Sequence, residues 1–279
     1  MAITAQDVNR LRKMTGAGMM DCKKALTEAN GDFDAAVDLL RKKGQKVSAS
    51  RADRQTSEGS VFVQSNADHT EAVLVALGCE TDFVAKNEDF QKLGNTLVTQ
   101  AATHNPASTD ALLSLEIDGR PASEHLTDLM GRIGEKVEVL AYEKLTADKV
   151  VSYVHSNGKL GVLVALTGAN GSGEAAVEAG RDVAMQIAAM NPVAVDRDGV
   201  DAATVEREIE IGKEQAREEG KPEAMLEKIA IGKLNKFYQE NTLLNQKFVK
   251  DNGKTIRQYL NETHQGMSVS TFKRVNIGG

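Results

Sequence analysis

Apolar and polar positions alternate with helical spacing over residues 4–43. The apolar residues form three short runs, which Gly16 and Asn30-Gly31 interrupt. Thr4, with Asp7 three positions later, predicts a capping box for the first helix, and Lys43-Gly44 predicts the end of the third. The residues expected to face inward are Val8, Leu11, Met14, Phe33, Ala36, Val37 and Leu40. So small a core predicts an accessory three-helix module.

The middle of the chain contains an internal repeat. Phe62–Asn66 recurs as Tyr153–Asn157, and Val73–Leu77 recurs as Val162–Leu166. Each copy is a β-branched run, an Asn-containing turn and a second apolar run, which is the pattern of a β-hairpin. A helical stretch and a third strand are expected after each copy, the strands being Val137–Leu145 and Val269–Ile277. The repeat predicts two related subdomains, each with a small antiparallel sheet.

A second helical pattern interrupts the later copy of this repeat. Two runs with spacings of three and four residues flank the turn Gly220-Lys221-Pro222, and charged residues occupy their other faces. The predicted seam is Val205, Ile209, Gly212 and Ala216 in the first helix, and Met225, Ile229 and Gly232 in the second. The pattern predicts an antiparallel helical hairpin. It is either a coiled-coil arm that projects from the body or an ordinary surface pair.

The predicted fold class is therefore α+β. The expected order is a three-helix module at 1–45, a linker at 46–59, a core N-subdomain at 60–145, a core C-subdomain at 146–200 and 233–279, and the inserted hairpin at 201–232.

Composition narrows the class of protein. The chain is 41% hydrophobic and 27% charged, as in ordinary soluble globular proteins. The longest apolar run, Ala72–Leu77, is too short to cross a bilayer, and the N-terminus lacks the pattern of a secretory signal. Cys22 and Cys79 fall in different predicted modules, so we expect no disulfide and a reducing, cytoplasmic location.

The net charge of −6 is distributed unevenly. Residues 1–58 hold 11 Lys and Arg against 8 Asp and Glu, so the rest of the chain carries all of the net negative charge. A basic head on an acidic body favours a protein partner of mixed charge over direct binding of nucleic acid, which calls for a clustered basic face. Alternatively, this charge distribution belongs to an ordinary solvated surface and has no functional meaning.

Most residues that could form a catalytic, cofactor or metal site lack the neighbouring sequence that such a site requires. Gly171–Ala176 fits a dinucleotide fingerprint, but its strand is expected to pair in a hairpin rather than in a parallel βαβ unit. The five histidines show no metal-ligand spacing, so we expect no metal and no cofactor. The acidic neighbours of Cys79, Glu80 and Asp82, should raise the pKa of its thiol rather than activate it.

The segment Thr81-Asp82-Phe83-Val84 allows two interpretations. It follows an apolar strand and precedes a polar helix. An exposed aromatic side chain beside a carboxylate at a loop tip would suit contact with a partner. Alternatively, Thr81 or Asp82 caps the helix and Phe83 packs onto the sheet. The pattern alone leaves both open.

Two long motifs resemble the signatures of the elongation factor Ts family. They are Leu11–Leu26 (LRKMTGAGMMDCKKAL) and Cys79–Lys86 (CETDFVAK), in the family's order. Met130–Glu135, Ser152–Ser156 and Gly220–Pro222 also resemble family segments, and the likeness runs from residue 3 to about 277. The resemblance implies a ubiquitin-associated-like head. It also implies a guanine nucleotide exchange factor for elongation factor Tu rather than an enzyme.

The resemblance assigns roles to particular residues. Arg12, Met19 and Met20 match the surface that holds the partner's nucleotide domain, and the C-subdomain would touch a second domain of elongation factor Tu. Thr81, Asp82, Phe83 and Val84 match the segment that disturbs the partner's magnesium site. Ile133, Gly134 and His155 match core positions facing the partner, although His155 also fits an ordinary hydrogen-bonded strand residue. A dimer of heterodimers is compatible with this scheme.

The chain also departs from the family pattern. Gly78 stands where the family usually has Asn, so the strand end is expected to differ in shape, and a further C-terminal helix of some members is not expected. Two other functions compete with exchange: an RNA- or ribosome-binding module that uses the basic head, and a nucleotide-dependent enzyme that uses Gly171–Ala176. Affinity that falls steeply with salt would favour the first, and binding of a labelled dinucleotide the second.

Overall fold

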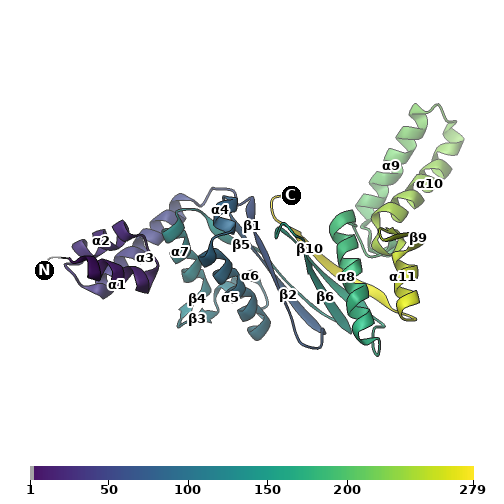
Figure 1. Cartoon of the computed structure of the whole chain (residues 1–279). Helices are drawn as coiled ribbons and strands as arrows, with labels where there is room; N and C mark the ends of the chain where they lie inside the picture. Colours follow the sequence, from purple (N-terminus) through teal and green to yellow (C-terminus); the bar gives the residue numbers. More distant parts are fainter. Residues whose placement is uncertain (1–2) are drawn as a thin grey trace.

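The N-terminal part of the chain is three packed helices, and the computed structural model describes residues 3–279 (Figure 1). The helices are α1 (Ala5–Thr15), α2 (Met19–Glu28) and α3 (Phe33–Ser50). The predicted capping box of Thr4 and Asp7 is confirmed. Leu11, Cys22 and Leu26 are fully buried between the helices. A likeness to ubiquitin-associated domains remains a prediction.

Two predictions for these helices are wrong. The third helix does not end at Gly44 but continues to Ser50, because Gly44 is buried against α7 (Ala122–Ile133). A methyl group on Gly44 would lie 2.9 Å from the carbonyl oxygen of Thr127, so this glycine allows a close helix crossing rather than a helix end. Met14 is 58% exposed because it lines an open cavity between α1 and α7 instead of the helical core.

The next part of the chain forms a three-stranded antiparallel sheet with helices on one side (Figure 1). The strand order is β1-β2-β5, which confirms the predicted first hairpin and third strand. The elements are β1 (Glu58–Ser65), β2 (Glu71–Cys79), α4 (Asp82–Ala85), α5 (Glu88–His104), α6 (Thr109–Leu113), β3 (Glu116–Ile117), β4 (Arg120–Pro121), α7 and β5 (Val137–Thr146). We call this sheet the first sheet.

A second sheet repeats the same arrangement. Its order is β10-β7-β6, again with the second strand of the hairpin in the centre and both neighbours antiparallel to it. The elements are β6 (Lys149–Val154), β7 (Leu160–Thr167), α8 (Gly173–Met190), β8 (Lys247–Phe248), β9 (Asp251–Thr255), α11 (Ile256–Thr263) and β10 (Ser268–Asn276). The two sheets and their helices confirm the α+β class.

The two sheets pack face to face, which explains why their central strands are continuously apolar. Val73, Val75 and Leu77 of β2 pack against the helices, whereas Ala72, Leu74 and Ala76 pack against the second sheet. The same alternation holds in β7. Gly161 permits the close approach, since a methyl group on it would lie 2.4 Å from Val61. A strand that is buried on both faces reads as an uninterrupted apolar run.

Helices α9 (Ala202–Glu218) and α10 (Glu223–Asn241) lie side by side and extend away from the second sheet (Figure 1). The predicted seam of α9 is correct at Gly212 and Ala216, which are buried. The predicted seam of α10 is wrong, because Leu226 and Ala230 are buried while Met225 is 48% exposed and Gly232 faces open space. The helix also continues past 232 to Asn241. Its classification as a coiled coil remains a prediction.

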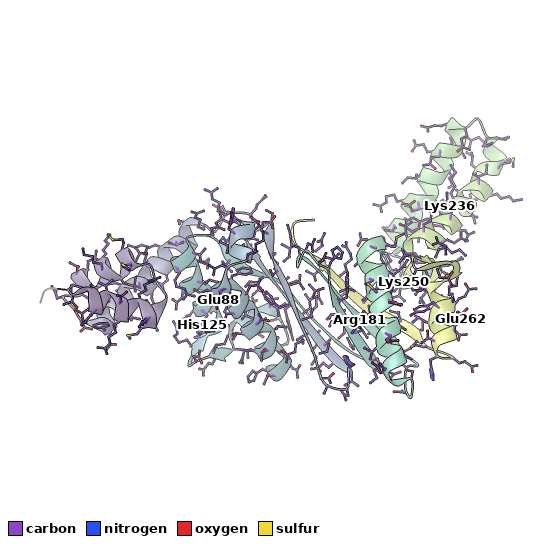
Figure 2. All side chains as sticks on the ribbon, viewed as in Figure 1. Glu88, His125, Arg181, Lys236, Lys250 and Glu262 are labelled. Atoms are coloured by element: carbon purple, nitrogen blue, oxygen red, sulfur yellow. The ribbon has the colours of Figure 1, made fainter. Side chains whose placement is uncertain are left out.

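Charged side chains such as Arg181, Lys236, Lys250 and Glu262 lie on the helical parts around the second sheet and on the helices that extend from it (Figure 2). Many form surface ion pairs, such as Lys250 with Asp182 at 2.7 Å and Lys236 with Glu240 at 3.7 Å. Pairs of this kind contribute about 0–1 kcal/mol each, so they indicate solvated faces rather than sites. Among residues 3–279, no helix combines the length and the apolar character that a membrane crossing requires.

Candidate functional site

The strand-to-helix turn after β2 presents an aromatic side chain to solvent. Phe83, in the short helix α4, is 82% exposed, the most of any large hydrophobic side chain among residues 3–279. The next residue, Val84, is 6% exposed and packs in the core of the first sheet. Phe83 therefore does not pack onto the sheet, which excludes that interpretation of the segment. Burying this ring against a partner would gain hydrophobic free energy.

Thr81 is held by a residue distant in sequence rather than by the helix that it begins. It occupies the N-cap position of α4, as one of the two interpretations expects, but its side chain makes no capping bond. Instead, its hydroxyl donates to the Glu135 carboxylate at 2.9 Å, and its backbone N–H donates to Glu135 Oε2 at 3.1 Å. The turn is therefore anchored to the segment between α7 and β5.

Asp82 carries a carboxylate next to Phe83. Lys86 Nζ donates to its Oδ2 at 2.7 Å, and this hydrogen bond lowers the pKa of Asp82 below its ordinary value while raising the pKa of Lys86. Both side chains are largely exposed. The turn thus presents an apolar ring together with a fixed negative charge at neutral pH.

Ile133 and Gly134 lie beside this turn. Ile133 is the last residue of α7 and is partly buried in the core of the first sheet. Gly134 ends α7 with φ of 82°, a conformation that favours glycine, and no atom lies within 4 Å of where its Cβ would be. Because Glu135 follows directly and bonds Thr81, the structure brings Ile133 and Gly134 next to the Thr81–Val84 segment.

The N-terminal helices expose one of the predicted basic residues and several methionines. Arg12 is exposed, and so are Met19 at 53% and Met20 at 73%. Met14, which sequence reasoning placed in the core, is exposed as well. Methionine side chains are flexible and polarisable, so an exposed group of them suits a protein contact.

Arg132 joins this helical head to the α7 end of the site. Its Nη1 donates to the Thr15 carbonyl oxygen at 3.5 Å, and its side chain packs where a Cβ on Gly16 would be. Its Nε lies 3.5 Å from Asp89. Arg132 lies in the family-like segment Met130–Glu135, but its role in joining the two parts could not be predicted, because its partners lie far away along the chain.

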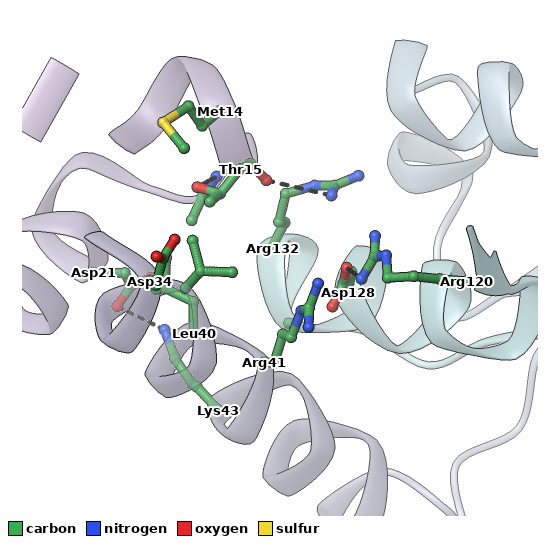
Figure 3. Close-up of a pocket in the computed structure, with 13 residues that line it drawn as sticks. Met14, Thr15, Asp21, Asp34, Leu40, Arg41, Lys43, Arg120, Asp128 and Arg132 are labelled. Atoms are coloured by element: carbon green, nitrogen blue, oxygen red, sulfur yellow. Dashed lines mark hydrogen bonds and ion pairs between the residues drawn. The ribbon is translucent and has the colours of Figure 1, made fainter. Parts of the chain in front are cut away.

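A cavity of about 410 Å³ opens between the N-terminal helices and α7 (Figure 3). Its polar lining consists largely of paired charges: Lys43 lies 2.6 Å from Asp21, and Arg120 lies 2.8 Å from Asp128. Arg41 lines it too, and no ion pair of Arg41 occurs among the described residues. Within residues 3–279, no group of three or more His, Cys, Asp or Glu side chains is arranged to hold a metal ion.

His155 lies in the turn after β6. Its backbone N–H donates to the Leu160 carbonyl oxygen at 2.8 Å, and its Nδ1 lies 2.9 Å from the Tyr153 hydroxyl. Lys159 of the same turn pairs with Glu58 at 2.9 Å, and Glu58 faces Cys79 in the first sheet. The turn therefore approaches the end of the first sheet from which the Thr81–Val84 segment emerges. His155 itself is exposed, one residue beyond the strand.

The remaining candidates have structural explanations. The strand before Gly171–Ala176 has antiparallel neighbours on both sides, so the parallel βαβ context of a dinucleotide site is missing there. His125 lies on α7 (Figure 2), with Nε2 2.8 Å from the Ile117 carbonyl oxygen. Burial, followed by the charges of Glu135 and Glu58, raises the pKa of Cys79 to about 12. The expected direction is correct, but the charges responsible are not those of Glu80 and Asp82.

Known proteins of one family match this chain over nearly its whole length. The family model described as "Elongation factor TS" matches residues 80–279. Elongation factor Ts of Cytophaga hutchinsonii is 60% identical over 276 residues, covering 99% of both chains, and that of Amoebophilus asiaticus is 56% identical over 278 residues, covering 100% of both. Elongation factor Ts of Thermobifida fusca is 46% identical over 281 residues, covering 99% of this chain and 98% of its own.

Proposed function

The chain belongs to the elongation factor Ts family, and on this premise we propose that it is a guanine nucleotide exchange factor in translation elongation. It binds elongation factor Tu carrying GDP in the cytoplasm, promotes release of the GDP and lets GTP bind. The observation that carries the proposal is Phe83, 82% exposed on a turn anchored to Glu135 and placed beside the ionised Asp82.

Such a factor needs no covalent chemistry. A GTPase holds GDP through backbone contacts to the phosphates and a magnesium ion at the β-phosphate. A protein that binds the emptied GTPase better than the loaded one shifts the equilibrium toward release. Each tenfold gain in release rate requires about 1.4 kcal/mol off the barrier. Because linkage is reciprocal, incoming GTP then weakens the hold of the factor.

Within this scheme, the Thr81–Val84 segment acts on the magnesium site of the partner. Phe83 inserts its ring between partner elements, and Asp82 brings its negative charge close to the magnesium-binding groups. Thr81 and Val84 keep the turn in place, the first through Glu135 and the second through its burial in the core. Because the backbone under the ring is already anchored, insertion orders little more than the side-chain torsions of Phe83, which limits its entropic cost.

Other surfaces supply affinity. Arg12, Met19 and Met20 of the N-terminal helices bind the nucleotide domain of the partner. Ile133 and Gly134 widen the contact beside the Thr81–Val84 segment, and His155 adds to it from the turn after β6. The second sheet and its helices touch a second domain of elongation factor Tu. Two such heterodimers are able to associate without changing this division of roles.

The test follows release of fluorescent GDP from elongation factor Tu. The chain should accelerate release, and Phe83→Ala should slow the maximal rate at least about tenfold while binding weakens modestly. Ile231→Ala is the matched control, because Ile231 is 49% exposed on α10, outside the proposed contacts. Unchanged exchange by Phe83→Ala would refute insertion of the ring, and no acceleration by the unmodified chain would refute the function.

A further inference from the structure

Two carboxylates join the end of β2 to the start of β5 by a reciprocal pair of bonds. Glu135 Oε2 accepts from the backbone N–H of Thr81 at 3.1 Å. Glu80 Oε1 accepts from the backbone N–H of Lys136 at 2.7 Å. Each side chain thus bonds the N–H of the residue that directly follows the other glutamate.

These bonds begin where the strand pairing stops. The last paired residues of β2 and β5 are Cys79 and Val137, so the N–H groups of Thr81 and Lys136 lie beyond the ladder. A buried N–H without an acceptor is costly, and a bond to an ionised acceptor is stronger than one between neutral groups. The two glutamates therefore continue the connection between the strands past its ordinary end.

Residues at and just after the end of α3 contact both sides of the pair. Arg51 Nη1 lies 3.0 Å from Glu80 Oε2, and the Glu80 side chain is only 15% exposed. Lys136 Nζ donates to the carbonyl oxygen of Arg54 at 3.1 Å. The pair is thereby connected to the segment that leads back to the N-terminal helices.

The helix that presents Phe83 cannot hold its own orientation. α4 has only four residues, and its N-cap, Thr81, makes no side-chain capping bond. Val84 and Ala85 are buried beneath it, and the Glu135 carboxylate binds both the N–H and the hydroxyl of Thr81 at its start. Without Glu135, the Thr81 N–H and hydroxyl would lose their acceptor, and the Cys79 thiol, 3.2 Å from the Thr81 carbonyl oxygen, would remain as the hydrogen-bond contact of Thr81 with β2.

We infer that Glu80 and Glu135 are positioning residues that set the direction in which Phe83 projects. This inference rests on the proposed exchange function. The pair does not touch the partner's nucleotide; it limits the turn to the geometry from which the ring inserts. Preorganisation of this kind raises the maximal rate, whereas affinity depends mainly on the wider contact surface.

The experiment compares Glu135→Ala with Glu135→Gln in the full chain. Glu135→Ala should lower the maximal GDP-release rate about 10- to 100-fold, while the factor concentration at half-maximal rate changes less than about threefold. Glu135→Gln should stay within about threefold of the unmodified chain, because the amide oxygen accepts from the Thr81 N–H and the amide donates to its hydroxyl. A purely structural role would not separate rate from affinity in this way.

Glu71→Ala is the matched control. Glu71 pairs with Lys144 at 2.7 Å, so it also connects β2 with β5, but at the far end of the strands. Its exchange rate should equal that of the unmodified chain. If Glu135→Ala does not fold, Glu80→Ala tests the same pair by removing the acceptor of the Lys136 N–H, with a smaller fall in maximal rate expected because Glu80 does not bond Thr81 itself.

The outcomes separate this inference from the proposed function. If Glu135→Ala exchanges at the full rate while Phe83→Ala is slow, the positioning role is wrong and the function stands. If Glu135→Ala loses affinity and rate in equal proportion, the pair serves stability only, which also overturns the inference. If the unmodified chain itself fails to release GDP, the proposed function fails first.

Discussion

Gly44 of α3 and Gly131 of α7 meet backbone to backbone. A methyl group on Gly131 would lie 2.7 Å from the Cα atom of Gly44, a distance that real Cβ atoms do not adopt. The two glycines therefore let the helices cross at a separation that leaves no room for a side chain on either of them. This crossing connects the N-terminal helices to α7, whose last residue, Ile133, lies beside the Thr81–Val84 segment.

Gly131→Ala should destabilise the chain. The added methyl group meets backbone rather than a movable side chain, so α3 and α7 must separate, at a cost of about 1–3 kcal/mol. The matched control is Gly232→Ala in α10, where no atom lies within 4 Å of the new Cβ. That variant should gain about 1 kcal/mol from helix propensity. Denaturant unfolding measures both, and equal shifts in the same direction would contradict the close crossing.

Gly78 lies where a Cβ atom would collide with a neighbouring side chain. A Cβ at this position would lie 2.6 Å from Leu140 Cδ1, whose side chain is 41% exposed and therefore able to move. Gly78→Ala should cost about 1 kcal/mol, and Leu140→Ala in the same chain should remove most of that cost. A double-mutant cycle of unfolding free energies measures this coupling. Strictly additive effects would show that Leu140 does not limit position 78.

Much of the fold was predictable because patterns of residues close together in the sequence determine its helix ends, hairpins and turns. The capping box of Thr4, the hairpins at Val73–Leu77 and Val162–Leu166, and the break at Gly220 all depend on residues a few positions apart. The end of α3 and the seam of α10 were wrong because tertiary contacts decided them. Gly44 has the sequence signature of a helix end, yet α7 uses it for close packing.

The site was predictable only in part, for the same reason. The motif around Phe83 can be recognised, but its exposure depends on whether the sheet offers a place for the ring, which no local pattern encodes. The contacts of Glu135 and Arg132 could not be predicted from the sequence, because their partners, Thr81 and Thr15, lie far away along the chain. Contacts of this kind leave no periodic signal in a single sequence.

The Cys79 thiol should make stability fall at alkaline pH. Its folded pKa is about 12, chiefly because of burial, whereas an unfolded cysteine has a pKa near 8.5. Above about pH 8.5, unfolding therefore releases a proton, so this stabilisation is complete below that pH and is lost as the pH rises toward 12. Denaturant unfolding between pH 7 and pH 10 should show a steeper decline for the unmodified chain than for Cys79→Ala. Parallel pH profiles would argue that the thiol ionises equally in both states.

Lys86 should control the pKa of Asp82 without controlling exchange. Its hydrogen bond is the main cause of the lowered pKa of Asp82, so Lys86→Met should raise that pKa toward its ordinary value in a carboxyl NMR titration. The pair contributes to stability above that value, and the contribution is lost as the pH falls. Asp82 nevertheless stays ionised from about pH 5.5 to pH 8 in both forms.

GDP release should therefore keep the same pH profile in Lys86→Met over that range, whereas Asp82→Asn should slow release equally at every pH. Lys213→Met is the control for loss of a surface pair, because Lys213 lowers the pKa of Glu210 in the same way on α9, away from the site. It should change neither rate nor profile. An Asp82→Asn chain that exchanges at the full rate would show that the ring of Phe83 acts without the neighbouring charge.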